Sequence, residues 1–270
     1  MARPAPEAGA LDWFTRPSAT STGSLNLAFN ALDRHVVRGL ADEPALLHPF
    51  AAAGTRSSYS YADLLEQVGQ LGGALRELGV TPGRTVVLAL PVGPELVFGL
   101  LACARIGAVV VPLIDDAPDG IGRLGHDPAV DRPAVVVVDS PRRAVVGAVL
   151  GAAGRAPDYE VVRQPEAGTV DASAGTFDLA VLMRPGSFQP AACAELAPGS
   201  PFLLRLSPSD AAGTTTVHDQ AWGHELAAAA VLAGWAPGSY VHPADDPTAA
   251  APYGALLGPL LVGATVELRE

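Results

Sequence analysis

A glycine followed by three threonines, Gly213-Thr214-Thr215-Thr216, stands between the apolar stretch Phe202–Leu206 and the helical pattern Trp222–Gly234. Glycine lets a backbone approach a ligand closely, and backbone N–H groups and threonine hydroxyls can donate hydrogen bonds to phosphate oxygens. Where a strand leads into a helix, such a run can hold a phosphate or another anion. The same four residues also fit an ordinary loop without a ligand.

Two neighbouring arginines, Arg142 and Arg143, follow the apolar strand pattern Ala134–Asp139. Arginine presents a planar fork of N–H donors, which suits bidentate contact with a phosphate group. The pair is therefore a candidate phosphate contact. The alternative is two solvent-facing arginines that open a helix.

A proline-rich stretch contains His242, Asp245 and Asp246, which could form an acid/base or metal-binding cluster. Polar residues in such a stretch are also typical of solvated turns. The sequence has no Gly-x-Ser-x-Gly nucleophile elbow and no Cys-x-x-Cys pair. No catalytic residue can therefore be named from these patterns.

The hydrophobic pattern predicts a scaffold for these residues. Ser60 can cap a helix whose apolar residues recur every three or four positions as far as Leu78, with Gly79 as its end. Uninterrupted apolar runs between turn residues predict strands buried on both faces. The strand candidates are Thr85–Leu90, Ala108–Leu113, Ala134–Asp139, Glu160–Arg163, Asp178–Leu182, Phe202–Leu206 and Thr265–Leu268. Strands that alternate with crossover helices predict an α/β fold with a mainly parallel sheet and helices on both faces.

Composition narrows the classes of protein that fit. The chain has 270 residues, 49% of them hydrophobic, and a net charge of −11, which predicts a globular protein that does not bind nucleic acid. All 17 basic residues are arginine, so Schiff-base and other lysine-dependent chemistry is excluded. Two cysteines are too few for a disulfide framework, and the sequence shows neither an N-terminal apolar signal nor an apolar run of membrane-spanning length. We therefore expect a cytoplasmic protein that does not insert into a membrane.

Several motifs carry a resemblance to a known family. An opening pattern of the type W-F followed by L-N-x-x-x-N-x-L-D-R-H runs from Asp12 to Val36, and later stretches follow in the same order as in that family. These stretches are Tyr59–Leu64, Leu90–Glu95, Leu101–Ala108 and, more faintly, Tyr253–Leu260 with Gly263–Thr265. Together they resemble the AMP-forming acyl-CoA synthetases, in particular the acetyl- and propionyl-CoA synthetases of the adenylate-forming superfamily. The resemblance spans nearly the whole chain but only about the first half of a family member.

The resemblance implies the front part of an adenylate-forming N-terminal domain, with a damaged phosphate loop. The threonine run stands where the family has S-G-T-T-G-x-P-K-G, but Thr216 replaces the second glycine and no lysine follows. Loss of a charged contact to phosphate costs about 1.5–3 kcal/mol. In the family, the adenine, ribose and magnesium contacts and the catalytic lysine come after the point where this chain ends. We therefore expect an anion-loop remnant that does not use ATP and magnesium productively, in a chain that does not form acyl-AMP by itself.

The resemblance also implies two ligand contacts. Arg142 and Arg143 lie close to where acetyl-CoA synthetases place an arginine that contacts a phosphate of CoA. The stretch His242–Ala250 stands at the family's acyl-pocket motif but lacks its tryptophan, so it either lines an enlarged acyl pocket or has simply drifted. The candidate lining residues are Asp245, Asp246, Thr248 and Tyr253. CoA or acyl-CoA is accordingly a better candidate ligand than ATP.

Two functions of different classes fit these observations. The first is a truncated, degenerate acyl-CoA synthetase-like pseudoenzyme that binds an acyl or CoA group or acts as a scaffold. The second is an enzyme, either one half of a split acyl-CoA ligase or a protein that uses the inherited cleft for a new acyl-group reaction. The chain could also be a piece of a longer gene product.

The expected organisation is an N-terminal lead-in and helical segment over residues 1–58 and an α/β domain over residues 59–270. A half-length family domain would leave apolar surface uncovered near Ala255–Val262. We therefore expect a homodimer or a stable protein partner.

Overall fold

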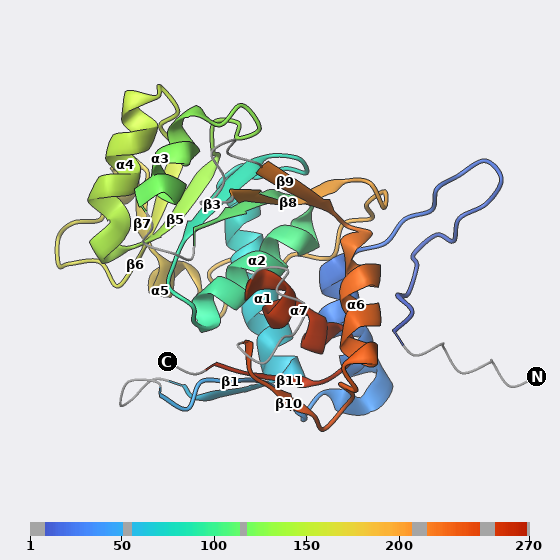
Figure 1. Ribbon diagram of the computed structural model, residues 1–270. Helices are drawn as coiled ribbons and strands as arrows, with labels where there is room; N and C mark the ends of the chain where they lie inside the picture. Colours follow the sequence, from blue (N-terminus) through green and yellow to red (C-terminus); the bar gives the residue numbers. More distant parts are fainter. Residues whose placement is uncertain (1–8, 51–55, 114–117, 207–214, 244–251, 269–270) are drawn as a thin grey trace, which may run out of the picture. The chain divides into compact units, whose positions relative to one another are not determined.

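The computed structural model describes residues 9–50, 56–113, 118–206, 215–243 and 252–268 (Figure 1). By its internal contacts the chain forms two compact units that are interleaved in sequence. The terminal unit comprises Met1–Glu66, Glu195–Pro198 and Gln220–Glu270, and the central unit comprises Gln67–Ala194 and Gly199–Asp219. The predicted lead-in over residues 1–58 lies within the terminal unit, and its standing as a separate domain stays a prediction.

The central unit contains a seven-stranded sheet in the order β7-β6-β5-β3-β4-β8-β9. All neighbouring strands are parallel except β8 and β9, which are antiparallel. The strands are β3 (Thr85–Ala89), β4 (Val109–Pro112), β5 (Val135–Asp139), β6 (Tyr159–Arg163), β7 (Thr176–Asp178), β8 (Pro201–Leu206) and β9 (Thr215–Asp219). The predicted α/β fold with a mainly parallel sheet is confirmed.

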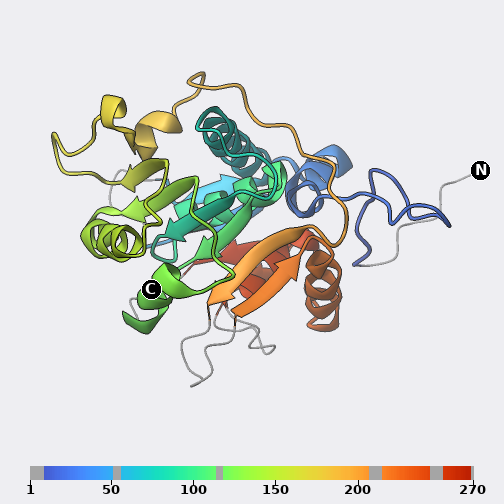
Figure 2. The same ribbon diagram turned by 90° about the horizontal axis from the view of Figure 1, so that it is seen from above.

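Helices cover both faces of this sheet, which explains why the strands are continuous apolar runs (Figure 2). Alternate residues such as Val87 and Val136 pack against α3 (Pro118–His126) and α4 (Arg143–Ala152). The intervening residues face the other way, where α2 (Pro94–Ile106) packs so closely that a Cβ at Gly99 would lie 2.8 Å from Leu88 Cδ1. The valine-rich strands therefore bury side chains on both sides.

Local signals set the helix ends as expected. At the start of α1 (Tyr61–Glu77), the Asp63 N–H donates to the Ser60 hydroxyl and the Ser60 N–H donates to Asp63 Oδ2, at 3.1 and 2.9 Å. This reciprocal arrangement satisfies two N–H groups at the beginning of the helix. Shortly after the end of α1, Gly79 adopts a φ of 80°, a left-handed conformation that favours glycine.

The terminal unit has a second, four-stranded sheet in the order β10-β11-β1-β2. Its strands are β1 (Pro44–Leu47), β2 (Ser58–Ser60), β10 (Tyr240–Val241) and β11 (Thr265–Glu267), and only β2 is antiparallel to its neighbour. The helical segments are η1 (Phe29–Asp33), η2 (Val36–Leu40), α6 (Trp222–Leu232) and α7 (Pro252–Leu261). Helix α7 packs on α6 and η1, and its residues Ala255–Leu261 are buried. The apolar surface that was expected to be uncovered near Ala255–Val262 is therefore largely buried.

Two expectations about local structure were wrong. Asp178–Leu182 was expected to form a strand, but β7 ends at Asp178 and a short helix, α5 (Leu179–Leu182), follows. The Asp178 carboxylate accepts a hydrogen bond from the Ala180 N–H, so it caps the helix and ends the strand. Thr215 and Thr216, expected in a loop, begin β9. Two short 3₁₀ turns, η3 (Ser140–Arg142) and η4 (Ala172–Ala174), complete the described elements. No helix within the described ranges has the length and apolar character needed to cross a membrane.

Candidate functional site

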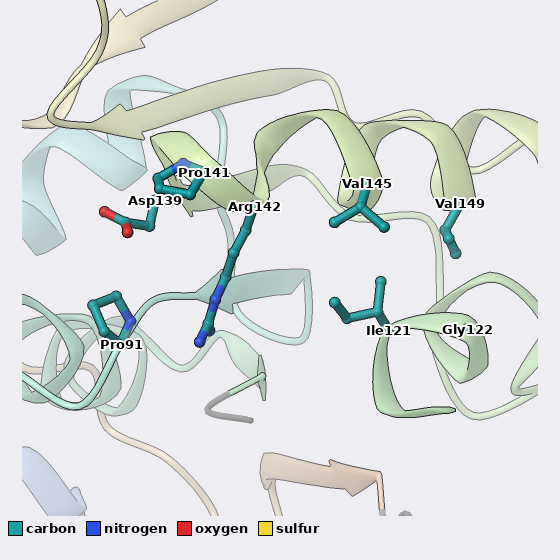
Figure 3. A pocket seen from close by; sticks show the side chains of 8 residues that line it. All are labelled: Pro91, Ile121, Gly122, Asp139, Pro141, Arg142, Val145 and Val149. Atoms are coloured by element: carbon teal, nitrogen blue, oxygen red, sulfur yellow. The ribbon is translucent and has the colours of Figure 1, made fainter. Parts of the chain in front are cut away.

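A groove of about 580 Å³ lies at the carboxyl ends of the central strands (Figure 3). After β3 the chain crosses to β4 on one side, and after β5 it crosses to β6 on the other. In open α/β sheets, ligands bind where the crossovers from two neighbouring strands, here β3 and β5, lead in opposite directions along the sheet. Pro91 follows β3, while Asp139, Pro141 and Arg142 end or follow β5, so the groove occupies that point.

One wall of the groove is apolar and comes from two packed helices. Ile121 and Gly122 belong to α3, and Val145 and Val149 belong to α4. Helices α3 and α4 approach closely, because a Cβ at Gly125 would lie 3.0 Å from Val149 Cγ1. Val145 is 46% exposed, so solvent and ligands can reach this wall.

Arg142 supplies the positive charge at the polar end of the groove. Its Nη1 donates to the carbonyl oxygens of Leu113 and Leu90, at 2.8 and 3.2 Å. These carbonyls follow β4 and β3, so the guanidinium is held at the carboxyl edge of the sheet. Asp139, also in the groove, binds Arg163 at 2.9 Å and therefore carries a charge that is already paired.

Arg143 is directed elsewhere. Its side chain pairs with Glu160 at 2.7 Å and donates to the carbonyl of Thr169 at 2.8 Å, and it does not line the groove. The two arginines that the sequence treated as a pair therefore have different neighbours. Only Arg142 lies where a ligand in the groove would meet it.

Thr215, in the described part of the predicted phosphate loop, forms hydrogen bonds with both members of an ion pair. The Thr215 hydroxyl donates a short hydrogen bond to Asp127 Oδ2 and accepts one from Arg123 at 2.8 Å. Arg123 also pairs with Asp127 at 2.6 Å, one helical turn apart. Burial raises the pKa of Asp127, but hydrogen bonds from Thr215, the Ala129 N–H and Arg123 outweigh it and lower that pKa below its usual range. A carboxylate therefore occupies the neighbourhood of the threonine run.

The other predicted site residues are only partly described. Thr216 lies on β9 opposite Arg205, whereas Gly213 and Thr214 lie outside the described residues. Asp245, Asp246 and Thr248 also lie outside them, and Tyr253 is buried in α7. Among the described residues, no three His, Cys, Asp or Glu side chains are grouped closely enough to hold a metal ion. Cys103 is fully buried, and burial raises the pKa of its thiol.

Sequence reasoning missed Asp127, Arg123 and the valine wall of the groove. The spacing of Arg123 and Asp127, four residues apart, is a usable signal for an ion pair on one helix face. Its link to Thr215 is not, because that contact joins residues 88 positions apart in the chain. Val145 and Val149 looked like ordinary apolar positions of a helix.

Comparisons with known proteins agree on the family. The AMP-binding enzyme family model matches residues 33–170, slightly more than half of the 270-residue chain. Acyl-CoA synthetase short-chain family member 3, mitochondrial, from Rattus norvegicus is 42% identical over 96 residues, which cover 34% of this chain and 14% of the rat protein. Acetyl-coenzyme A synthetase from Deinococcus radiodurans is 48% identical over 87 residues, 32% of this chain and 13% of that protein.

A solved structure extends the likeness along the chain. The acetoacetyl-CoA synthetase from Streptomyces lividans superposes with a TM-score of 0.72 and 25% identity, over 95% of this chain and 40% of that one. The chain thus spans well under half the length of these relatives. The predicted resemblance to acyl-CoA synthetases is confirmed.

Proposed function

This chain belongs to the AMP-binding enzyme family, and from that premise we propose that it is an acyl-CoA synthetase-like pseudoenzyme. It binds an acyl or CoA group in the groove beside Arg142 and does not form acyl-AMP by itself. Its site of action is the cytoplasm. The contact of Thr215 with Asp127 and Arg123 carries the proposal.

That contact argues against a triphosphate. A phosphate loop works by directing hydroxyl and N–H donors and a cation at the phosphates. Here the Thr215 hydroxyl donates to Asp127, a carboxylate that is held ionised and would repel a phosphate, and Arg123 is engaged by the same carboxylate. No lysine is present anywhere in the chain to restore the missing charge.

The groove suits a ligand that is apolar along most of its length and anionic at one end. Ile121, Val145 and Val149 form a wall for an acyl chain or a pantetheine arm, and Arg142 places a guanidinium at the other end. A volume of about 580 Å³ is within the usual range for small-molecule sites. A guanidinium suits the oxygens of a phosphate or a thioester.

A second candidate is an enzyme that uses the same groove, as one half of a split acyl-CoA ligase or for a new acyl-group reaction. The intact sheet with both helical layers favours it, because a drifting sequence would not keep buried strands in register. The distinguishing observation is turnover. Pyrophosphate release with ATP, magnesium and short carboxylic acids should stay at background, and acid-dependent release would favour the enzyme.

Calorimetry with CoA and acetyl-CoA tests the groove. We expect binding that weakens by about tenfold or more in Arg142→Ala, since a charge-assisted hydrogen bond contributes about 1.5–3 kcal/mol. Arg132→Ala is the matched control, because Arg132 is 55% exposed and pairs with Asp158 away from the groove. If CoA and acetyl-CoA do not bind, or if both variants bind equally well, the groove is not the ligand site.

A further inference from the structure

The terminal unit contains a cavity of its own, of about 410 Å³. Its apolar lining comes from Gly9 and Ala10, the end of η2, the end of α6 with the segment after it, and the end of α7. Leu40, Val231, Trp235 and Leu261 contribute to it. Among the residues that the structure describes, the ionisable side chains in the lining are Arg34, His35 and Arg38, all of a basic type, although the chain as a whole carries a charge of −11.

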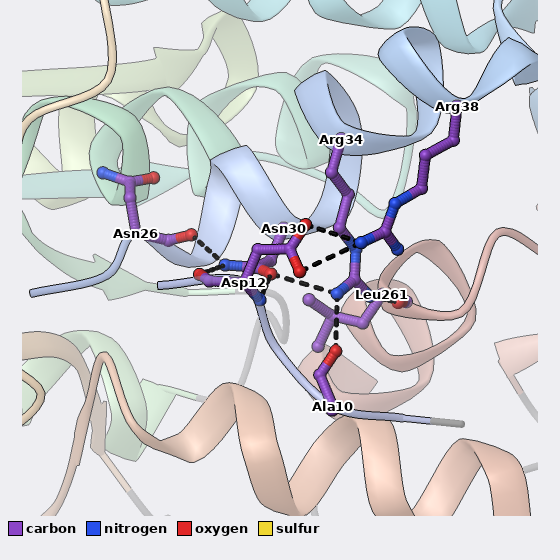
Figure 4. A network of polar contacts seen from close by, with 7 residues as sticks. All are labelled: Ala10, Asp12, Asn26, Asn30, Arg34, Arg38 and Leu261. Carbon is purple, nitrogen blue, oxygen red and sulfur yellow. Dashed lines mark hydrogen bonds and ion pairs between the residues drawn. The ribbon is translucent and has the colours of Figure 1, made fainter. Parts of the chain in front are cut away.

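Arg34 is a cation that is buried without a direct carboxylate partner (Figure 4). Arg34 is 4% exposed. Its guanidinium donates hydrogen bonds to the carbonyl oxygens of Ala10 and Leu261 and to the side-chain oxygen of Asn30. All three acceptors are neutral. Its Nε has no hydrogen-bond partner. A buried charge is costly unless an opposite charge compensates it, so this arrangement lacks an anion.

The charge of Asp12 acts on Arg34, but the Asp12 carboxylate is not bonded to Arg34 and binds a second arginine instead. Nη2 of Arg38 donates to both carboxylate oxygens of Asp12, at 2.9 and 2.7 Å, so Asp12 is paired with that arginine (Figure 4). The guanidinium groups of Arg34 and Arg38 and the single carboxylate of Asp12 together carry one net positive charge. Burial, together with the positive charges of Arg34 and Arg38, lowers the pKa of His35 to about 4, so its ring is neutral at physiological pH. His35 is 5% exposed and its Nε2 also has no partner.

We propose that this cavity binds a small organic carboxylate, with its negative charge toward Arg34 and its apolar body against Leu40, Val231 and Trp235. A monoanion matches the single uncompensated charge, which a phosphate dianion would exceed. A volume of about 410 Å³ accommodates a ligand of the size of an aromatic or short-chain acid. The site has no lining residue in common with the groove beside Arg142 and does not depend on the function proposed for that groove.

Titration of the full chain with benzoate, followed by calorimetry and by tryptophan fluorescence, tests the proposal. We expect saturable binding with a dissociation constant of about a millimolar or less. Benzamide, which has the same shape without the charge, should bind at least about tenfold more weakly. Phenyl phosphate should also bind more weakly than benzoate.

Two variants separate the cavity from the rest of the surface. Ala236 lines the cavity and is exposed, so Ala236→Phe can fill the cavity without disturbing Arg34. Ala233→Phe, at an exposed residue outside the lining, is the matched control. Benzoate affinity should fall by about tenfold or more in the first and stay unchanged in the second. The proposal is overturned if benzoate shows no saturable binding up to about 10 mM, if benzamide or phenyl phosphate binds as tightly, or if Ala236→Phe binds benzoate normally.

Discussion

Arginine supplies every permanently cationic side chain in this protein, and three arginines lie in settings that differ from an exposed ion pair. Arg142 spans strand ends beside a groove, Arg123 closes the contact between Thr215 and Asp127, and Arg34 is buried among neutral oxygens. A guanidinium has five N–H donors in a fixed plane and can therefore hold several acceptors at once. The lack of lysine removes lysine chemistry from this chain, but it leaves the chain able to bind anions.

His35 should make stability depend on pH. Burial and the nearby Arg34 and Arg38 lower the pKa of His35 from 6.5 to about 4 in the folded protein. Between these two pH values the unfolded chain binds a proton at His35 that the folded protein does not bind. The free energy of unfolding is therefore highest above pH 6.5 and falls as the pH drops toward 4. The loss attributable to this one group is at most roughly 3 kcal/mol.

Urea unfolding of wild type and His35→Gln across this range measures the effect. The variant should lose less stability than wild type on acidification, whatever its stability at neutral pH, because glutamine does not titrate. His126→Gln, at an exposed histidine, should follow the wild-type slope. Equal slopes for wild type and His35→Gln would show that the ring does not resist protonation.

At the level of elements, most of the correctly predicted strands and helices were recognised from the pattern of apolar residues in the sequence. Runs such as Val135–Asp139 were recognised as strands because both faces are covered, and Ser60 and Gly79 marked helix ends through their side chain or lack of one. The short strands β1, β2 and β10 were not predicted. They have two to four residues and are stabilised by pairing with distant segments, which a local pattern does not show.

The candidate site was less predictable for the same reason. Arg142 was identified from residue type and position after a strand, and the structure places it in a groove. Its neighbour Arg143 pairs with Glu160, a contact set by the alignment of β6 beside β5 and not by the adjacent sequence. Thr215 was assigned to a loop, although a β-branched run also favours a strand, and β8 provides the partner.

Helix glycines should respond to alanine in opposite ways, according to what surrounds them. Gly73 lies within α1, and a Cβ there would stand 2.1 Å from the carbonyl oxygen of Gln189. Gly147 lies within α4 with nothing within 4 Å of its Cβ position. Gly73→Ala should therefore destabilise the protein by about 1–3 kcal/mol through a backbone clash. Gly147→Ala should stabilise it by about 0.5–1 kcal/mol through helix propensity.

Chemical denaturation of the two variants and of wild type measures the change in the free energy of unfolding, which should be a loss for Gly73→Ala and a gain for Gly147→Ala. Each serves as the control of the other, because both replace a helical glycine by alanine. A stable Gly73→Ala would mean that α1 and the segment around Gln189 are not packed as closely as the structure has them.

At the scale of the whole molecule, the reason first given for association does not hold, since Ala255–Leu261 is buried. Other apolar side chains in the terminal unit are exposed. Val37 is 84% and Leu232 is 89% exposed, and each is next in sequence to a residue that lines the cavity beside Arg34, Arg38 and Val231 respectively. Single exposed apolar residues are ordinary on a monomer, but two strongly exposed ones next in sequence to residues of one cavity are a candidate contact surface.

We therefore expect the protein to form a homodimer or to bind a protein partner through this surface. Full burial of one leucine contributes about 1.5–3 kcal/mol, so Leu232→Glu should raise the dissociation constant by about tenfold or more. Val181→Glu, a like change at a 43% exposed valine of the central unit, should leave it unaltered. Light scattering across a concentration series distinguishes the outcomes. If the wild-type protein stays a monomer at every concentration, self-association is excluded. If it dimerises and Leu232→Glu dimerises equally well, the interface lies away from Leu232.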